Sequence, residues 1–394
     1  MDSTENLKRK AMAWIDAARD DLLALSRRLQ ANPETAYQEH LAAVWLSEEL
    51  RRAGFEVEQG VAGLPTAFVA AWKGQEAGPC IGLIAEYDAL PGVGHGCGHN
   101  LIATGAIGAA LGAAAVMPDL RGSLKLFGAP AEEYTGGRAG KLLMLEAGVF
   151  DGVEACLMFH PWTDTCAPRS DLGYVVLDAI FHGKSAHAAA DPWNGLNALD
   201  GVFVTYAGLS ALRQQMRPDA RLHVIVTDGG EAVNSIPRRA ALRTMFRSPD
   251  RHYLDELRRR IEKVIAGAAQ ATDTRAEIQH LTTVYNSRFD TVLYHVVREN
   301  LARLGVELNA VDFLPISSDF GNVSQTLPAF YFMMKTHPTG INWHSTEVAE
   351  GAIGDQAHAA LLIAAKALGA SVVDLLGRPE LLGKAAQQFA DAAA

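Results

Sequence analysis

Side chains able to bind metal ions or to move protons gather in the stretch IGLIAEYDALPGVGHGCGHN, residues 81–100. Cys97 and His99 offer a thiolate and an imidazole two residues apart, a pairing that suits zinc or a similar transition metal. Taken alone, Cys97 is better explained as an inert buried thiol. The polar candidates that follow the apolar start of this stretch are Glu86, Asp88, His95, Cys97 and His99.

A pair of adjacent carboxylates, Glu132 and Glu133, is the second feature with chemical potential. Neighbouring side chains on a turn point in different directions, so one can bind a metal while the other faces a bound water. A metal lowers the pKa of such a water towards about 7, and a carboxylate general base can take its proton. The alternative is a solvated acidic pair, but an apolar segment and Gly128-Ala129-Pro130 lead directly into it.

Two histidines are further candidates. His160 follows the apolar run Cys156 to Phe159, and His344 lies in a polar segment. Each taken alone is also compatible with a structural or surface histidine. A rival interpretation makes Cys97 a nucleophile with a nearby histidine as its base, aided by the dipole of a helix that begins near Leu101.

The elements that must position these residues alternate between strands and helices. Strands are predicted at 55–58, 67–72, 81–85, 124–127 and 155–159, with two helices over 5–53 and further helices at 101–117 and 137–147. Asn100 is expected to cap the helix 101–117. Such alternation predicts an α/β fold with a mixed, mostly parallel sheet flanked by helices. The candidate ligands follow different strands, so they should converge at one edge of that sheet.

The pattern changes between residues 173 and 283, where strands and helices follow the order β-α-β-β-α-β. This order predicts a compact α+β unit of the ferredoxin-like type. We therefore expect residues 1–172 and 284–394 to form one domain, and residues 173–283 to be inserted into it. A strand at 329–334 and a helix at 353–368 complete the first domain.

Bulk properties exclude several classes of protein. The chain has 394 residues, is 49% hydrophobic and 20% charged, and has a formal net charge of −10. This acidity argues against a nucleic-acid partner, which needs a concentrated basic surface. The four cysteines form no CxxC pair, residues 1–30 lack a signal peptide's apolar core, and the apolar run 101–117 is shorter than the ~20 residues of a membrane span. A cytoplasmic protein without a membrane segment is expected.

Six motifs in order give the chain a family resemblance. They are GHGCGHN, Glu132-Glu133, His160-Pro161, HGKSAHAA at 182–189, Asn234 to Pro237, and His344 to Glu347. Together they resemble the M20 metallopeptidase/amidohydrolase family, in particular its M20D branch. The form AEYDALPG…GHGCGHN is most similar to the p-aminobenzoyl-glutamate hydrolases and related dipeptidases.

The resemblance implies a zinc-peptidase-like catalytic domain and a role for each matching residue. Glu132 matches the general acid/base, and Asp88 an aspartate that supports a metal-site histidine. His187 would reach the active site of the neighbouring subunit, in a homodimer or higher oligomer assembled through a dimerisation and lid domain at 173–283. Asn234 and Arg247 match positions that hold the substrate's carboxylate. Two divalent ions, zinc or manganese with cobalt as a further option, would be bound by Cys97, His99, Glu133, His160 and His344.

The function expected from these features is hydrolysis of an amide bond by a metal-activated water. The substrate would be a small molecule with a carboxylate, either an N-acyl or N-aroyl amino acid or a dipeptide, with residues 316–321 as candidates for its side-chain pocket. Better-known M20D members read ADMDALP and CGHD, so Asn100 replaces a carboxylate and their substrate preferences do not transfer. The alternatives are a thiol hydrolase acting through Cys97 and a non-catalytic binding protein on the same scaffold.

Overall fold

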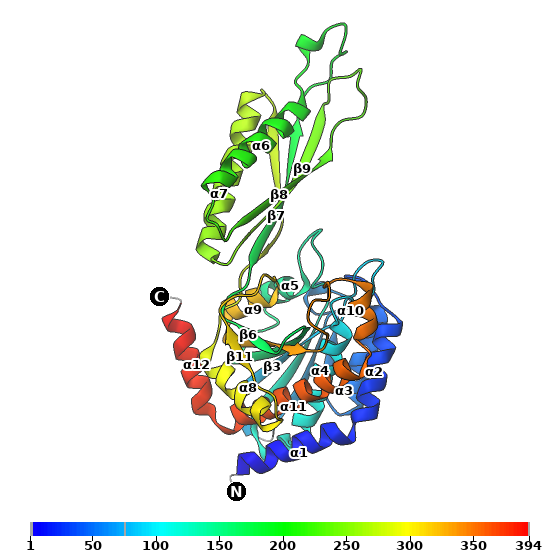
Figure 1. Cartoon of the computed structure of the whole chain (residues 1–394), viewed down its shortest axis with the longest axis vertical. Coiled ribbons are helices and arrows are strands. Elements are labelled where there is room, and N and C mark those ends of the chain that lie inside the picture. The colour runs from blue at the N-terminus through cyan, green and yellow to red at the C-terminus, as the bar shows by residue number, and fades with distance from the viewer. Residues whose placement is uncertain (1–2, 75, 393–394) are drawn as a thin grey trace.

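The computed structural model describes residues 3–74 and 76–392, which form two bodies. A main body carries an eight-stranded sheet together with the first and the last helix, and an inserted body carries a four-stranded sheet that projects from it (Figure 1). The chain crosses between them where the inserted sheet begins at Gly173 and where it ends at Val284.

The main sheet has the strand order β1-β2-β4-β3-β5-β12-β6-β11. Its central strands β4, β3, β5 and β12 run parallel, whereas β1 and β2 are antiparallel additions at one side. The predicted mixed sheet flanked by helices is therefore confirmed. The strands are β1 (Glu56–Gln59), β2 (Phe68–Lys73), β3 (Glu76–Glu86), β4 (Arg121–Ala129), β5 (Ala155–Trp162), β6 (Cys166–Pro168), β11 (Asn309–Val311) and β12 (Ala329–Lys335).

Helices cover both faces of this sheet. On one face, a large apolar core unites the sheet with α1 (Ser3–Ala17), α2 (Arg19–Ala31), α3 (His40–Arg52), α4 (His99–Ala114), α8 (Thr291–Arg303), α11 (Asp355–Gly377) and α12 (Pro379–Asp391). On the other face, a smaller core forms under the short helices α5 (Gly140–Glu146) and α9 (Phe320–Thr326). The helix α10 (Thr346–Gly351) follows the loop that carries His344.

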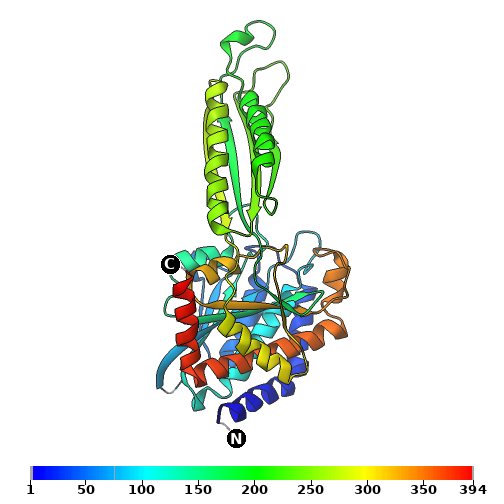
Figure 2. The ribbon, with the colours of Figure 1, turned by 60° about the vertical axis from the view of Figure 1, so that its left-hand side comes forward.

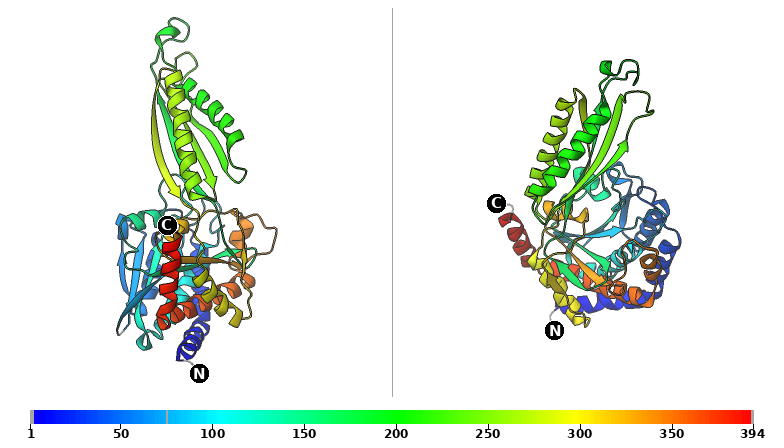
Figure 3. Two further views of the ribbon diagram at one scale, coloured as in Figure 1. Left: turned by 90° about the vertical axis from the view of Figure 1, so that its left-hand side faces the viewer. Right: turned by 45° about the horizontal axis from the view of Figure 1, so that its top comes forward.

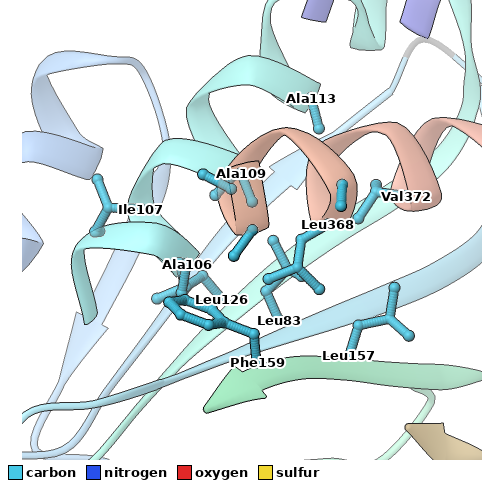
Figure 4. Packing of buried hydrophobic residues seen from close by; sticks show 14 of the residues in the cluster. Leu83, Ala106, Ile107, Ala109, Ala113, Leu126, Leu157, Phe159, Leu368 and Val372 are labelled. Carbon is cyan, nitrogen blue, oxygen red and sulfur yellow. The ribbon is translucent and has the colours of Figure 1, made fainter. Parts of the chain in front are cut away.

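Close packing of α4 and α11 on the strands explains the composition of these two helices. Every residue of α4 is buried, and a Cβ atom at Gly105 would lie only 2.4 Å from the ring of Phe159 on β5. Leu368 and Val372 of α11 meet Ala109 and Leu83 in the same layer (Figure 4). By length and composition α11 could cross a membrane, but 83% of its most apolar window is buried, as expected of a core helix.

The inserted body folds in the predicted β-α-β-β-α-β order, with its strands arranged β10-β7-β9-β8. Two long helices lie side by side along one face of this sheet (Figure 2), and the other views show how narrow its attachment to the main body is (Figure 3). Its elements are β7 (Gly173–His182), α6 (Ala198–Leu212), β8 (Arg221–Asp228), β9 (Arg239–Ser248), α7 (Arg251–Ala271) and β10 (Arg275–Val284).

Three local predictions were wrong. The N-terminal segment forms three helices rather than two, because a break at Ala18 separates α1 from α2. Asn100 does not cap α4: the helix begins at His99, and Gly98 occupies the cap position with φ 74°. Asn100 instead donates its amide to Ser26 Oγ at 3.1 Å. His160 lies within β5 rather than beyond it.

Candidate metal centre and substrate cavity

The candidate site lies at the carboxyl ends of the central parallel strands. Glu86 is the last residue of β3 and pairs with Ala129, the last residue of β4, so the loop carrying Glu132 and Glu133 starts beside it. His160 lies in β5, which pairs in parallel with β12. The candidate side chains that follow these strands therefore lie at one edge of the sheet, as the order of the strands in the sequence predicted.

Backbone contacts fix the two loops that complete the site. Gly98, in the left-handed conformation, ends the Cys97 turn and starts α4, which places His99 in the first turn of that helix. The backbone N–H of His344 donates to Gly96 O at 3.1 Å, so the distant His344 loop is tied to the Cys97 turn. The indole Nε1 of Trp343 donates to Cys97 Sγ at 3.3 Å.

The five proposed metal ligands fall into two groups that share Cys97. The atoms of Cys97, His99 and His160 lie within 4.8 Å of one another, as do those of Cys97, Glu133 and His344. Cys97 Sγ lies 3.5 Å from His160 Nε2, and Glu133 Oε1 lies 3.1 Å from His344 Nε2. Two groups of candidate ligands, both including the Cys97 sulfur, are compatible with a centre that would hold more than one ion.

The hydrogen bonds around these ligands fit a metal centre. His99 Nδ1 pairs with Asp88 Oδ1 at 2.9 Å, and His160 Nδ1 lies 2.7 Å from the carbonyl of Pro161. Each contact leaves the Nε2 atom of the imidazole available, and in the described part of the chain no group hydrogen-bonds to the buried His99 Nε2. Carboxylates and carbonyls behind ligating imidazoles are typical of metal sites. The sulfur, nitrogen and oxygen donors suit zinc, manganese or cobalt.

Glu132 and Glu133 differ in their surroundings although they are neighbours. Burial, together with the nearby Glu86 and Glu133 carboxylates, raises the pKa of Glu132 well above its usual range. Burial also acts to raise the pKa of Glu133, but His344 and His99 outweigh it and lower this pKa to about 2. Two carboxyl groups whose pKa values are pushed apart are suited to different roles.

A strained backbone sets the direction of this pair. Ala131, directly before Glu132, has φ 58°, a conformation that non-glycine residues rarely adopt. Its N–H donates to Glu39 Oε1 at 2.9 Å, and the N–H of Glu133 donates to Asp88 Oδ2 at 2.9 Å. The residues before and after Glu132 are therefore both anchored to buried carboxylates.

A cavity of about 600 Å³ opens directly over these side chains, between the main and the inserted body. Apolar walls come from main-body residues, and the inserted body contributes a mixed group of polar and apolar side chains. The predicted pocket segment 316–321 is only partly correct, since Ile316 to Ser318 line the cavity whereas Asp319 bonds to Lys141 beneath it. The apolar walls are Met158, Trp162, Phe313 and Met333, and the inserted body provides Tyr174, Asp219, Arg221, Met245 and Arg247.

Arg247 is a cationic group that faces the cavity from β9. Burial lowers the pKa of its guanidinium, and among the described residues no carboxylate forms an ion pair with it, the phenol of Tyr174 being the one group that acts to raise this pKa. The ring of Tyr174 lies 5.9 Å from this guanidinium. A partly buried guanidinium without a carboxylate is prepared to receive an anionic ligand.

His187 and Asn234 are not brought to this cavity within one chain. They lie in the two loops at the end of the inserted sheet opposite its attachment, where His187 bridges to Ser235 and Ala188 N–H donates to Asn234 O at 3.1 Å. The ten-residue strand β7 separates that end from the main body by roughly 33 Å. Asn234 and Arg247, predicted to act on the same carboxylate, therefore lie at opposite ends of the unit.

Sequence reasoning missed several residues beneath and beside the site. The sequence marks Glu86 only as a neighbour of the candidate ligands and Asp319 only as part of the predicted pocket segment, and it gives no sign of Lys141 or Trp343. Lys141 and Asp319 meet across 178 positions of sequence, a contact for which neither spacing nor composition gives a signal. The four cysteines are all free and buried.

Comparison with known proteins agrees with this architecture. Residues 82–366 match the peptidase family M20/M25/M40, and the chain belongs to this family. It is 37% identical to the Xaa-Arg dipeptidase of Mus musculus, over 98% of this chain and 92% of that protein. It is 27% identical to one subunit of the p-aminobenzoyl-glutamate hydrolase of Escherichia coli, over 95% of this chain and 93% of that one.

Solved structures share the fold at lower identity. The aminobenzoyl-glutamate utilization protein from Klebsiella pneumoniae superposes with a TM-score of 0.74 at 20% identity, covering 93% of this chain and 98% of that one. A dinuclear metal-binding M20 peptidase from Bacillus subtilis gives 0.68 at 22% identity, covering 92% and 99%. With the family established, the chain is an enzyme that hydrolyses amide bonds, and the interpretation as a non-catalytic binding protein is set aside.

Proposed function

We propose that this protein is a dinuclear metal-dependent hydrolase of dipeptides or N-acyl amino acids that carry a free carboxylate. The observation that carries the proposal is one cavity lined by Cys97, Glu133, His160 and His344, with the fifth candidate ligand, His99, buried beside Cys97, and by the guanidinium of Arg247, which lacks a carboxylate partner among the described residues. The names of the two relatives above are consistent with such substrates.

The residues around the cavity would have different roles in the reaction. Divalent ions held by the five ligands would supply Lewis-acid polarisation of the amide carbonyl and an acidified water. Glu132 accepts the proton of the attacking water and then donates it to the nitrogen of the leaving amine. Arg247, which lines the same cavity, holds the substrate's carboxylate and so fixes the position of the scissile bond.

A second copy of this chain would complete the site. The inserted body exposes an apolar surface, here called the lid face, formed by Phe203, Val204 and Tyr206 of α6 and by Ile225 and Val226 of β8. Phe203 is 60% exposed and Ile225 is 61% exposed. In addition β8 is an edge strand of its sheet, so among the described residues no further strand pairs with its outer side.

Apolar patches and open strand edges of this kind mark association surfaces. We therefore propose a homodimer in which the two lid faces pack together and the inserted units pair. Each tip, with His187 and Asn234, would then serve the partner's cavity. His187 Nδ1 already accepts the N–H groups of Ala189 and Ala190, both at 3.1 Å, so Nε2 is a protonated donor that could stabilise an oxyanion.

The decisive test is an activity panel on metal-defined enzyme. Chelated protein is reloaded separately with zinc, manganese or cobalt and assayed on Xaa-Arg and other dipeptides, p-aminobenzoyl-glutamate and N-acetyl amino acids. We expect activity that disappears on chelation, returns with metal, and falls strongly when the substrate's carboxylate is converted to an amide.

The same panel distinguishes the metal-dependent reaction from the remaining alternative, a thiol hydrolase. A thiol hydrolase acting through Cys97 would be inactivated by alkylation and indifferent to chelators. Burial raises the pKa of Cys97 well above its usual range, so its thiolate depends on a bound cation, which the metal-dependent reaction supplies and a thiol mechanism lacks. Activity that survives complete metal removal would refute the metal-dependent mechanism.

A further inference from the structure

A buried ammonium group lies beneath the metal centre. Lys141, in the first turn of α5, is fully buried, and its Nζ lies 2.7 Å from Glu86 Oε1. The same Nζ forms an ion pair with Asp319, whose other carboxylate oxygen accepts the backbone N–H of Lys141 at 3.0 Å. Glu86 and Asp319 are themselves fully buried. The proposed reaction assigns no role to any of the three.

Glu86 connects this ammonium to the metal centre. Its Oε2 atom lies 3.6 Å from His99 Nε2, and among the described residues neither atom has a hydrogen-bond partner. Glu86, His99 and Glu132 offer ligand-type atoms within 4.8 Å of one another. One oxygen of Glu86 is therefore held by Lys141, and the other is directed at the nitrogen that would bind metal.

Three carboxyl groups, those of Glu86, Glu132 and Asp319, act on the one ammonium of Lys141. A buried ion pair is costly to desolvate, so the contact with Glu86 calls for a reason beyond joining two helices. The ion pair between Lys141 and Asp319 would by itself be enough to hold α5 against the start of α9. Glu86 is not needed for that contact, but its carboxylate lies where it would face a cation bound to His99.

We propose that Lys141 is a positioning residue for the metal centre, which fixes Glu86 so that its free oxygen faces His99 and strengthens cation binding there. This inference rests on the proposed metal-dependent function and deepens it. Asp319 orients Lys141 from the far side. Residues behind metal ligands typically change metal affinity by about 10–100-fold when they are altered.

The chain offers a matched control for this idea. Lys8 is a second buried lysine that meets two carboxylates, Glu5 at 2.8 Å and Asp374 at 3.1 Å, and it lies in α1, which contributes no residue to either ligand group. Lys8→Met and Lys141→Met remove the same chemistry from comparable surroundings. Only Lys141→Met should alter metal binding.

The test measures zinc and manganese affinity of the full-length apoprotein by titration against a competing chelator, with no substrate present. We expect Glu86→Gln and Lys141→Met each to weaken the binding of one ion about 10–100-fold. The double variant should be no weaker than the worse single variant, because both changes remove the same contact. Lys8→Met should lower thermal stability and leave metal affinity unchanged.

Wild-type metal affinity in folded Lys141→Met would overturn the inference, and Lys141 would then have only a structural role. If Lys141→Met does not fold, the isosteric Glu86→Gln decides alone, since wild-type affinity in that variant overturns the inference equally. Failure of the wild-type protein to bind any divalent ion would instead remove the proposed function and this inference with it.

Discussion

The two regions that carry the predicted functional residues are built in opposite ways. At the rim of the main sheet, Cys97, His99 and Glu133 are mostly buried and held by hydrogen bonds from separate loops. At the tip of the inserted unit, His187 and Asn234 are exposed, and their contacts are confined to the two tip loops. The rim gathers its candidate ligands within one chain, whereas the role proposed for the tip requires a second molecule.

The difference has a physical cause. Ligand atoms that must converge on one ion need a rigid support, and the ends of a packed parallel sheet provide it. The tip extends on long strands and has an exposed apolar lid face beside it. Such a surface gains stability from burial against a second copy, so the same contact that forms the dimer would position the tip.

Removal of the proposed general base, Glu132, should cause the largest loss of turnover, and it changes only the site at the edge of the main sheet. Glu132→Gln keeps the shape of the side chain but cannot accept the proton, so we expect turnover to fall by about 10²–10⁴-fold. The five ligands are unchanged, and metal content measured by elemental analysis should stay at the wild-type level. Wild-type-like activity in this variant would reject the assignment of Glu132.

His187→Ala probes the tip and should come next. Loss of one oxyanion donor typically costs about 10²–10³ in rate, while metal binding should be normal. Mixing this variant with Glu132→Gln should restore part of the activity, because a mixed dimer contains one cavity with an intact base and an intact partner histidine. No recovery after demonstrated subunit exchange would mean that His187 does not act across the interface.

In the proposed dimer, contact between the two lid faces brings the tip of one subunit to the cavity of the other. Disruption of the lid face should therefore have the same effect on activity as removal of His187. Phe203→Glu places a charge on the proposed interface, and we expect a monomer by light scattering with activity as low as that of His187→Ala. Leu41→Glu, at a residue of α3 that is 46% exposed, is the control and should leave assembly unchanged. A Phe203→Glu dimer with full activity would contradict the proposed interface.

The smallest effect is expected at the attachment of the inserted unit. The buried Asp171 accepts hydrogen bonds from Tyr331 Oη at 2.8 Å and from the N–H of Ser287 at 2.6 Å. Tyr331→Phe removes the first of these and should lower the free energy of unfolding by about 1–3 kcal/mol, measured by denaturant titration. The attached unit would still fold, so the loss should be one of stability.

The pH dependence of that loss follows from the charge of Asp171. Burial raises the pKa of Asp171 in the folded protein, and the hydrogen bonds from Ser287 and Tyr331 partly offset this rise. Without the Tyr331 hydroxyl the folded-state pKa rises further, because the ionised carboxylate is the species that loses stabilisation. The destabilisation should therefore grow as the pH rises through the folded-state pKa of Asp171, which lies above the unfolded value of about 3.9, and be smaller at more acidic pH. An equal loss at acidic and neutral pH would contradict this account.

Much of the fold and the candidate ligands could be predicted because the relevant signals are local. Apolar runs of strand length, each followed by polar residues, predicted which side chains would share one edge of the sheet. The N-terminal helices were misjudged because the break at Ala18 carries no proline or glycine. Asn100 was misassigned because Gly98, two residues earlier, takes the cap position. Asn100 is then the second residue of the helix, and its side chain lies in the core.

The sequence by itself determined the fold class, the order of its elements and the chemical types of the candidate ligands, since periodicity and residue chemistry are properties of neighbours along the chain. Only the tertiary structure decided that Lys141 and Asp319 lie under Glu86, that Arg247 faces the cavity, and that His187 and Asn234 do not. These outcomes depend on packing between segments far apart in the chain. Such packing is set by complementary shape and charge, which leave no periodic trace in the sequence.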